Sequence, residues 1–125
     1  MGKIDRFEDL IAWQKARELT RAVYAATGQG PFARDSELSS QIQRATVSIM
    51  SNIAEGFERF NPREFHQFVS IAKASCAGVR SQLYAALDAR HLDEQTFQVL
   101  MALGKETAKT IDGLRASVEQ RRDSQ

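Results

Sequence analysis

Apolar residues recur at intervals of three and four positions along most of this chain, and charged residues stand between them. This spacing matches the turn of an α-helix, about 3.6 residues, whereas a half-buried strand would alternate at every second residue. The pattern therefore predicts four amphipathic helices. They cover about residues 8–27, 36–57, 62–90 and 93–119.

Helix-ending and helix-starting residues separate these segments. The run Gly28–Pro31 ends the first segment, because glycine accepts the conformation after a helix and proline cannot continue one, and a short loop to Asp35 is expected next. The run Asn61–Glu64 supplies a cap, a first-turn proline and the glutamate of a capping box. Similar helix lengths and short connections predict an all-α fold, an antiparallel up-and-down four-helix bundle in a single domain over residues 1–125.

Composition supports this picture and limits the function. Only seven glycines and two prolines occur among 125 residues, which disfavours sandwiches and barrels. The net charge of +1 gives no general attraction to nucleic acid or membranes, so such binding would need a local patch. The single cysteine, Cys76, falls in an apolar stripe and excludes an internal disulfide, which fits a reducing cytoplasm. No charge-free run approaches the roughly 18 residues that span a bilayer, so we expect no membrane partner.

Several short motifs occur in the order found in a known family. These motifs are Trp13–Ala16 (Trp-Gln-Lys-Ala), Gln41–Ile49, Ser51–Gly56 (Ser-Asn-Ile-Ala-Glu-Gly) and Glu64–Phe68. Together they resemble the bacterial four-helix bundle proteins called the S23, or 23S rRNA intervening-sequence, family. The resemblance implies a small cytoplasmic bundle that assembles as a homopentameric ring and whose role is largely unknown. A looser likeness to the accessory proteins of diversity-generating retroelements implies binding to nucleic acid and to a reverse transcriptase.

A basic stripe is predicted beside the apolar face of the third segment. His66, Lys73 and Arg80 are seven residues apart, so they stay nearly in line along a helix. With Arg63 and Tyr84 they form the candidate nucleic-acid contacts, through phosphate pairing and base stacking. The open alternative is that the stripe pairs with acidic residues of a neighbouring helix or subunit.

The second segment carries polar residues at spacings of three and four, which places them on one face of a helix. These residues are Ser48, Ser51, Asn52 and Glu55. This face either meets a partner or forms a buried network that fixes register and assembly. Val47, Met50 and Ile71 fall outside the main apolar stripes, and surplus apolar surface on a small bundle is typical of an interface. The family-motif and interface candidates are Trp13, Gln14, Arg44, Ser48, Ser51, Asn52, Glu55, Gly56 and Ile71.

Residues for catalysis or metal binding are sparse. The two histidines, His66 and His91, are interpreted as polar surface residues, and Cys76 as a core residue. No metal-ligand spacing is present, so we expect no metal, no cofactor and no enzymatic activity. The sequence favours a self-assembling cytoplasmic bundle that serves as an RNA- or DNA-binding scaffold. The alternative is an adaptor that holds a protein partner on an exposed helical face.

Overall fold

The computed structural model describes residues 3–124, and this range contains helices and no strand. A short 3-10 helix, η1 (Phe7–Asp9), precedes α1 (Ile11–Thr27), α2 (Gly30–Arg34), α3 (Ser36–Glu58), α4 (Pro62–Asp88) and α5 (Glu94–Asp123). The all-α class predicted from the periodicity is confirmed. The predicted bounds of the second and third helices lie within two residues of α3 and α4.

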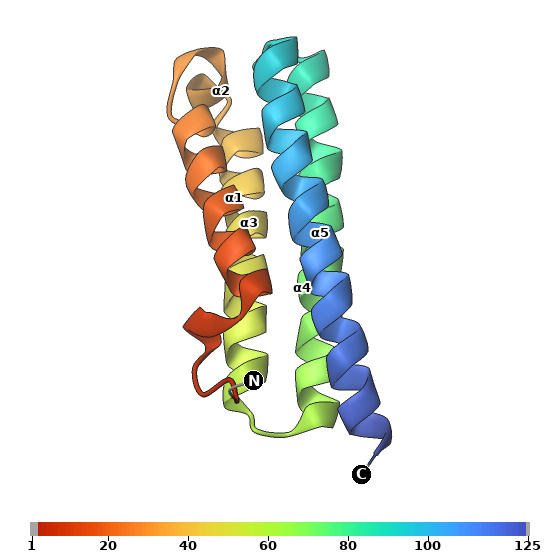
Figure 1. Ribbon diagram of the computed structural model, residues 1–125. Coiled ribbons are helices and arrows are strands. Elements are labelled where there is room, and N and C mark those ends of the chain that lie inside the picture. Colours follow the sequence, from red (N-terminus) through yellow and green to blue (C-terminus); the bar gives the residue numbers. More distant parts are fainter. Residues whose placement is uncertain (1–2, 125) are drawn as a thin grey trace.

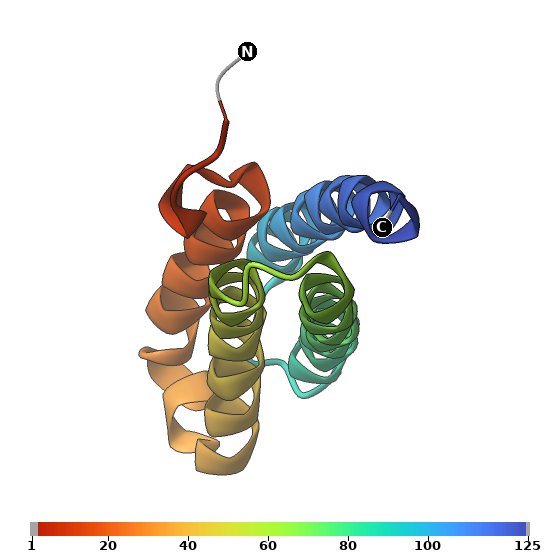
Figure 2. The same ribbon diagram turned by 90° about the horizontal axis from the view of Figure 1, so that it is seen from below.

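The four long helices lie side by side and form the body of the molecule (Figure 1). α4 packs against α3 and α5, and α1 packs against the same two helices, an arrangement seen from below in Figure 2. The apolar stripes meet between them and form one core. Fully buried side chains include Leu19, Ile42, Ile49, Ile53, Leu83, Ile111 and Val118. Cys76 on α4 is buried in the same core, which confirms its prediction as a core residue.

Side-chain caps fix where three of the long helices begin. The N-cap residues are Asp35 for α3, Asn61 for α4 and Asp93 for α5, whose side chains accept backbone N–H groups at 2.7 to 3.1 Å. Each cap satisfies an amide that has no partner inside its helix. The predicted start at Asn61 and Pro62 is confirmed. Glu64, however, lies 3.7 Å from Nη1 of Arg59, so an ion pair stands where a capping box is predicted.

The connection between α1 and α3 differs from the loop that the sequence predicts, because it contains α2. Pro31 stands in the first turn of α2, where its missing N–H would have no helical partner. Phe32 is buried, and its ring stacks on His91 with 5.3 Å between ring centres. Nε2 of His91 also lies 2.9 Å from Oδ2 of Asp35. The interpretation of His91 as a surface residue is therefore wrong, since this connection covers most of its ring.

Two helix ends also differ from the prediction. α1 begins only at Ile11, because Leu10 adopts an extended conformation, with φ −73° and ψ 126°. α5 continues past its predicted end to Asp123. Arg121 and Arg122 lie in its last turn, where cations stabilise the negative end of the helix dipole.

α3 and α4 approach each other closely at Gly56. A Cβ atom at this position would lie 2.6 Å from Cβ of Phe68 and 2.9 Å from Cδ1 of Phe65. Both distances are shorter than normal contacts, so only glycine leaves the two rings in place. Gly56 lies within the last turn of α3, which continues to Glu58.

We expect Gly56→Ala to lower the free energy of unfolding by about 1–3 kcal/mol, because two aromatic side chains must move to admit the methyl group. Gly113→Ala on α5 is the matched control, since a Cβ there meets no atom within 4 Å. This control should raise the free energy by up to about 1 kcal/mol. Urea denaturation at one protein concentration measures both, and equal effects would contradict the close contact.

Asp35→Asn tests the link between the α2 connection and His91. The hydrogen bond with His91, and then that from the Leu38 amide, hold the pKa of Asp35 below its ordinary value. The ionised carboxylate therefore stabilises the fold at neutral pH, and this stabilisation is lost as pH falls below about 4. Asparagine still caps α3. We expect a lower melting temperature at pH 7 and a difference from wild type that shrinks in acid.

The control for this substitution is Glu37→Gln, which removes a neighbouring exposed carboxylate of the same helix. It should leave the melting temperature nearly unchanged at both pH values. If Glu37→Gln lowers the melting temperature at pH 7 as much as Asp35→Asn does, the effect belongs to the helix dipole and not to the contact with His91.

Candidate functional site

The predicted basic stripe of α4 lies largely against α5. His66 is buried, with 9% of its surface exposed. Its Nδ1 lies 3.2 Å from Nη1 of Arg122, and its Nε2 lies 3.7 Å from Oε1 of Glu119. Because arginine only donates hydrogen bonds, Nδ1 of His66 is the acceptor in this contact. The interpretation of His66 as a surface residue is wrong, since α5 covers it.

Lys73 and Arg80 continue the same contact with α5. Nζ of Lys73 lies 2.6 Å from Oδ1 of Asp112. Arg80 is half-buried and passes close to Gly104, where a Cβ would lie 3.0 Å from Cγ of Arg80. His66 and Lys73 thus face carboxylates of a neighbouring helix, which is the alternative that the sequence left open. Asp112 partly balances the charge of Lys73, although the Lys73 side chain is 46% exposed.

Lys73 stays exposed despite its ion pair, and so do the two ends of the stripe. Arg63 is exposed in the first turn of α4. Tyr84 is 54% exposed near the other end, and its ring lies 5.2 Å from that of Phe97. The structure therefore gathers His66, Lys73 and Arg80 along α5 and separates the other two candidate contacts along the length of α4.

Trp13 and Gln14, from the first family motif, attach the N-terminal turn to α1. The Trp13 ring meets the ring of Phe7 nearly edge-on, with 5.2 Å between centres. Nε2 of Gln14 donates to the carbonyl oxygen of Glu8 at 2.9 Å. Both residues thus hold η1 in place, which is a structural role.

Lys15, in the same motif, joins α1 to α5. Its Nζ lies 2.6 Å from Oε1 of Glu106 and 3.3 Å from Oε2 of Glu18. The hydrogen bond to Glu106, followed by that to Glu18, raises the pKa of Lys15 above its ordinary value. The motif therefore connects three elements of the fold.

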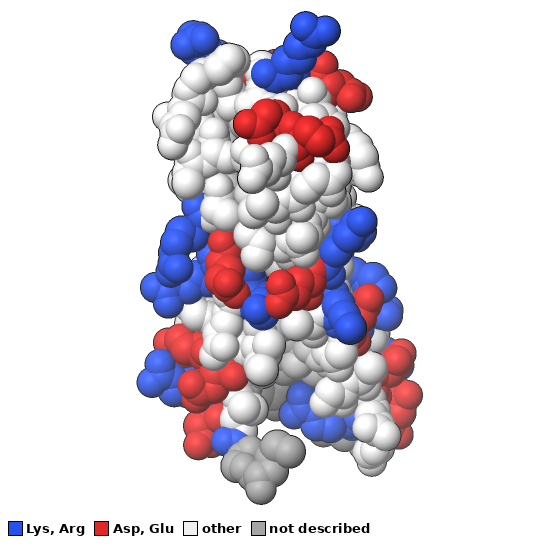
Figure 3. All heavy atoms as spheres, turned by 45° about the horizontal axis from the view of Figure 1, so that its top comes forward, with Lys and Arg blue, Asp and Glu red and all other residues white. Residues whose placement is uncertain are grey.

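A group of cations that sequence reasoning missed lies on α1. Arg17 and Arg21 are exposed and one turn apart. They line a depression of about 430 Å³ together with Arg6, Trp13, Gln14 and the two acidic residues Glu8 and Glu18. The Arg17 guanidinium lies 5.8 Å from the centre of the Trp13 ring. Figure 3 shows basic and acidic groups interspersed over the visible face, without an extended area of one sign. Two arginines one turn apart, following a tryptophan on the same helix, are the sequence signal that indicates this group.

The polar residues of α3 divide between an internal contact and the surface. Oγ of Ser48 lies 3.0 Å from Oγ of Ser75 on α4. Nδ2 of Asn52 donates to the Ser48 carbonyl oxygen at 2.8 Å and lies 3.1 Å from its Oγ. Ser51 is half-buried and Glu55 is exposed. The side chains of Ser48 and Asn52 are therefore hydrogen-bonded beside α4. Ser51 is partly exposed to solvent and Glu55 is exposed.

The outward surface of α3 and α4 combines two exposed apolar side chains with small, polar and oppositely charged residues. We call this surface the α3/α4 outer face; it comprises Arg44, Val47, Ser51, Glu55, Ile71, Ser75 and Gly78. Val47 is 40% exposed and Ile71 is 50% exposed, whereas Met50 packs against the core. Between residues 65 and 79 the two basic side chains of α4 both contact α5. The α4 half of this face consequently lacks charge.

Metal-ligating side chains do not cluster in the described part of the chain. Within residues 3–124 no cluster of three or more histidine, cysteine, aspartate or glutamate residues could hold a metal ion. Sγ of Cys76 donates to the carbonyl oxygen of Gly104 at 3.4 Å, and burial raises the pKa of its thiol. The reactive thiolate is therefore disfavoured. None of the helices over these same residues has the length and apolar character needed to cross a membrane.

These observations define a helical bundle. Most of its motif residues make contacts between helices, and its other candidate residues lie on the surface. The family described as 23S rRNA-intervening sequence protein matches residues 8–113. The chain belongs to this family, and the resemblance drawn from its motifs is confirmed. The family is one of unknown function.

A solved structure shares the fold. It is the crystal structure of a protein with unknown function from the S23 ribosomal protein family of Bacteroides thetaiotaomicron VPI-5482, with a TM-score of 0.77 and 18% identity. The alignment covers 85% of this chain and 96% of that one. A comparison with curated proteins gives no match. Function must therefore be argued from the surfaces of the molecule.

Proposed function

We propose that this protein is a non-enzymatic scaffold that assembles with copies of itself in the cytoplasm. The four long helices form an antiparallel up-and-down protomer, and a pentameric ring, which the family resemblance implies, is the expected assembly. The observation that carries the proposal is the α3/α4 outer face. Its apolar side chains lie in water in the single chain, and its α4 half has no charge to desolvate on association.

The composition of this face suits contact between two copies. Val47 and Ile71 gain free energy when their exposed area leaves water. A Cβ at Gly78 would meet no atom within 4 Å, so a neighbouring helix has room to approach there. Arg44 and Glu55 are exposed residues of opposite sign on the same face. They supply the polar rim that orients two copies.

Ile71→Lys should convert the assembly into 14.0 kDa monomers, because each contact would have to bury a new charge. The matched control is Val99→Lys, which places the same charge at a 56% exposed apolar residue of α5. Light scattering after size-exclusion chromatography should give a multiple of the chain mass for wild type and control. Circular dichroism checks that both variants remain helical.

A wild-type chain that is monomeric, or an Ile71→Lys variant of unchanged mass, would remove the self-assembly proposal. The same exposed face would then favour the second candidate function, an adaptor that holds a helix of another protein. Capture of a partner that survives nuclease treatment and is lost in Ile71→Lys would support the adaptor.

The scaffold is proposed to carry RNA or DNA through exposed cations. Because His66 and Lys73 face carboxylates of α5, the α1 cations Arg17 and Arg21 are the better phosphate contacts, and Trp13 offers an aromatic ring beside them. Arg63 is a further exposed cation on α4. Assembly would repeat these groups in every copy and so raise the local positive charge.

Fluorescence anisotropy with labelled single-stranded and duplex RNA tests this part of the proposal. We expect binding that weakens with salt and falls about tenfold or more in Arg17→Glu/Arg21→Glu. Lys73→Glu/Arg80→Glu should weaken binding less, and Lys105→Glu/Lys109→Glu is the charge-matched control on α5. Equal losses in all three double variants would indicate net charge alone, and no binding at low salt would exclude the RNA role.

A further inference from the structure

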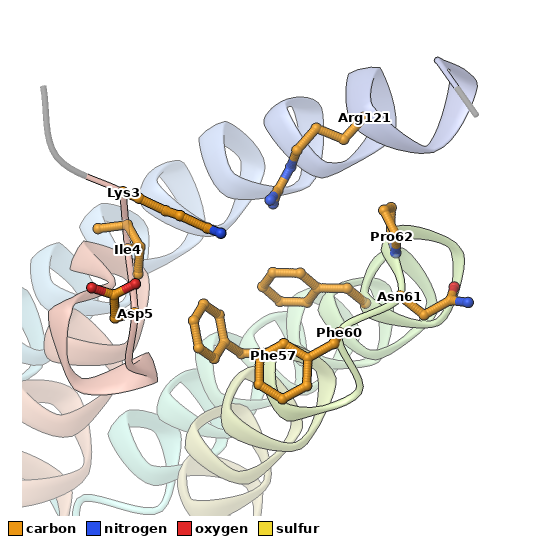
Figure 4. A pocket seen from close by; sticks show the side chains of 9 residues that line it. Lys3, Ile4, Asp5, Phe57, Phe60, Asn61, Pro62 and Arg121 are labelled. Carbon is orange, nitrogen blue, oxygen red and sulfur yellow. The ribbon is translucent and has the colours of Figure 1, made fainter.

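A pocket of about 270 Å³ lies at the end of the bundle where α3 meets α4 and where the last turns of α5 pass the N-terminal segment (Figure 4). Its apolar lining contains three aromatic rings, those of Phe57, Phe60 and Phe65, together with Ile4 and Pro62. The Phe57 ring meets Phe65 edge-on at 5.9 Å and lies 6.3 Å from Phe60. The volume is at the lower limit of small-molecule sites, so it suits a ligand with one ring.

Two cations, Lys3 and Arg121, line the same pocket. Figure 4 shows the ammonium group of Lys3 and the guanidinium group of Arg121 directed toward one another across the pocket. Arg121 is held above Phe65, with its Cζ 5.9 Å from the ring centre. Among residues 3–124 neither cation forms an ion pair, although Asp5 also lines the pocket. Two unpaired positive charges at one opening favour an anion between them.

The backbone conformation of Phe60 is a second and independent indication of a ligand site. Its backbone adopts φ 52°, in the left-handed region, where a side chain costs about 1–2 kcal/mol relative to glycine. Its ring is 81% exposed, so burial within the chain does not offset this cost. Glycine is the usual residue just after a helix, whereas here a strained phenylalanine presents its ring at the pocket.

We propose that this pocket binds a small aromatic carboxylate. The ligand ring lies against the three phenylalanine rings, and its carboxylate lies between Lys3 and Arg121. Arginine suits this role because its planar group donates two parallel hydrogen bonds to a carboxylate. The site does not depend on the proposed assembly, and it lies at the end of the bundle rather than on the α3/α4 outer face.

Titration with three probes separates the contributions of ring and charge. Phenylacetate has both, phenylacetamide keeps the ring without the charge, and acetate keeps the charge without the ring. Amide chemical shifts in the nitrogen-15-labelled protein should saturate with phenylacetate below about 10 mM. We expect each analogue to bind at least about tenfold more weakly, since each lacks one of the two contacts.

Variants then assign the contacts. Arg121→Gln should weaken phenylacetate about tenfold and leave phenylacetamide unchanged, and Lys109→Gln, an exposed lysine of α5 outside the pocket, should change neither. Phe60→Gly should weaken both ring-bearing probes while raising the melting temperature, because glycine accepts the left-handed backbone. That rise shows that lost binding is not lost folding.

The proposal is overturned if no probe gives saturable shifts, if phenylacetamide binds as tightly as phenylacetate, or if Arg121→Gln behaves like Lys109→Gln. Repeating the phenylacetate titration on Ile71→Lys keeps this result separate from the assembly. Unchanged affinity in a monomer supports a site built within one chain, and lost affinity in a folded monomer overturns it.

Discussion

Burial of the apolar stripe of α4 between α3 and α5 is the constraint on which the rest of the structure depends. Once this stripe faces inward, each flank of α4 must match a neighbouring helix. One flank requires the space left by Gly56 on α3. The other flank brings His66 and Lys73 to carboxylates of α5, at 3.7 and 2.6 Å. His66 and Lys73, which the sequence predicts to lie in a basic stripe, therefore take part in the contact between α4 and α5.

Because both flanks of α4 contact neighbouring helices, only the remaining exposed surfaces of the molecule are open to a partner or ligand. The side of α4 that faces neither neighbour carries small and apolar residues, of which Ile71 is 50% exposed. Within residues 3–124, cations that form no ion pair lie elsewhere: Arg17 and Arg21 on α1, and Arg121 beside Phe65. The proposed scaffold role rests on these two kinds of surface, the α3/α4 outer face and the exposed cations.

The motifs that identify the family act mainly in packing. Trp13 and Gln14 attach the N-terminal turn, and Lys15 reaches Glu106 on α5. Gly56 in the second motif leaves room for two phenylalanines. Recognition of the family from these residues is therefore recognition of a fold. A fold does not by itself specify a ligand, so these motifs do not name one.

The sequence by itself determined the helical class, the family, the starts of α3 and α4, and the place of Cys76 in the core. These features depend on the local period of apolar residues and on caps that act within one turn. Only the tertiary structure decided that His91 would stack on Phe32 and bond to Asp35, and that His66 would lie beneath Arg122. The two hydrogen bonds each join residues 56 positions apart. Periodicity places a residue on a face of its helix, but the packing of the other helices decides whether that face meets water, a carboxylate or an aromatic ring.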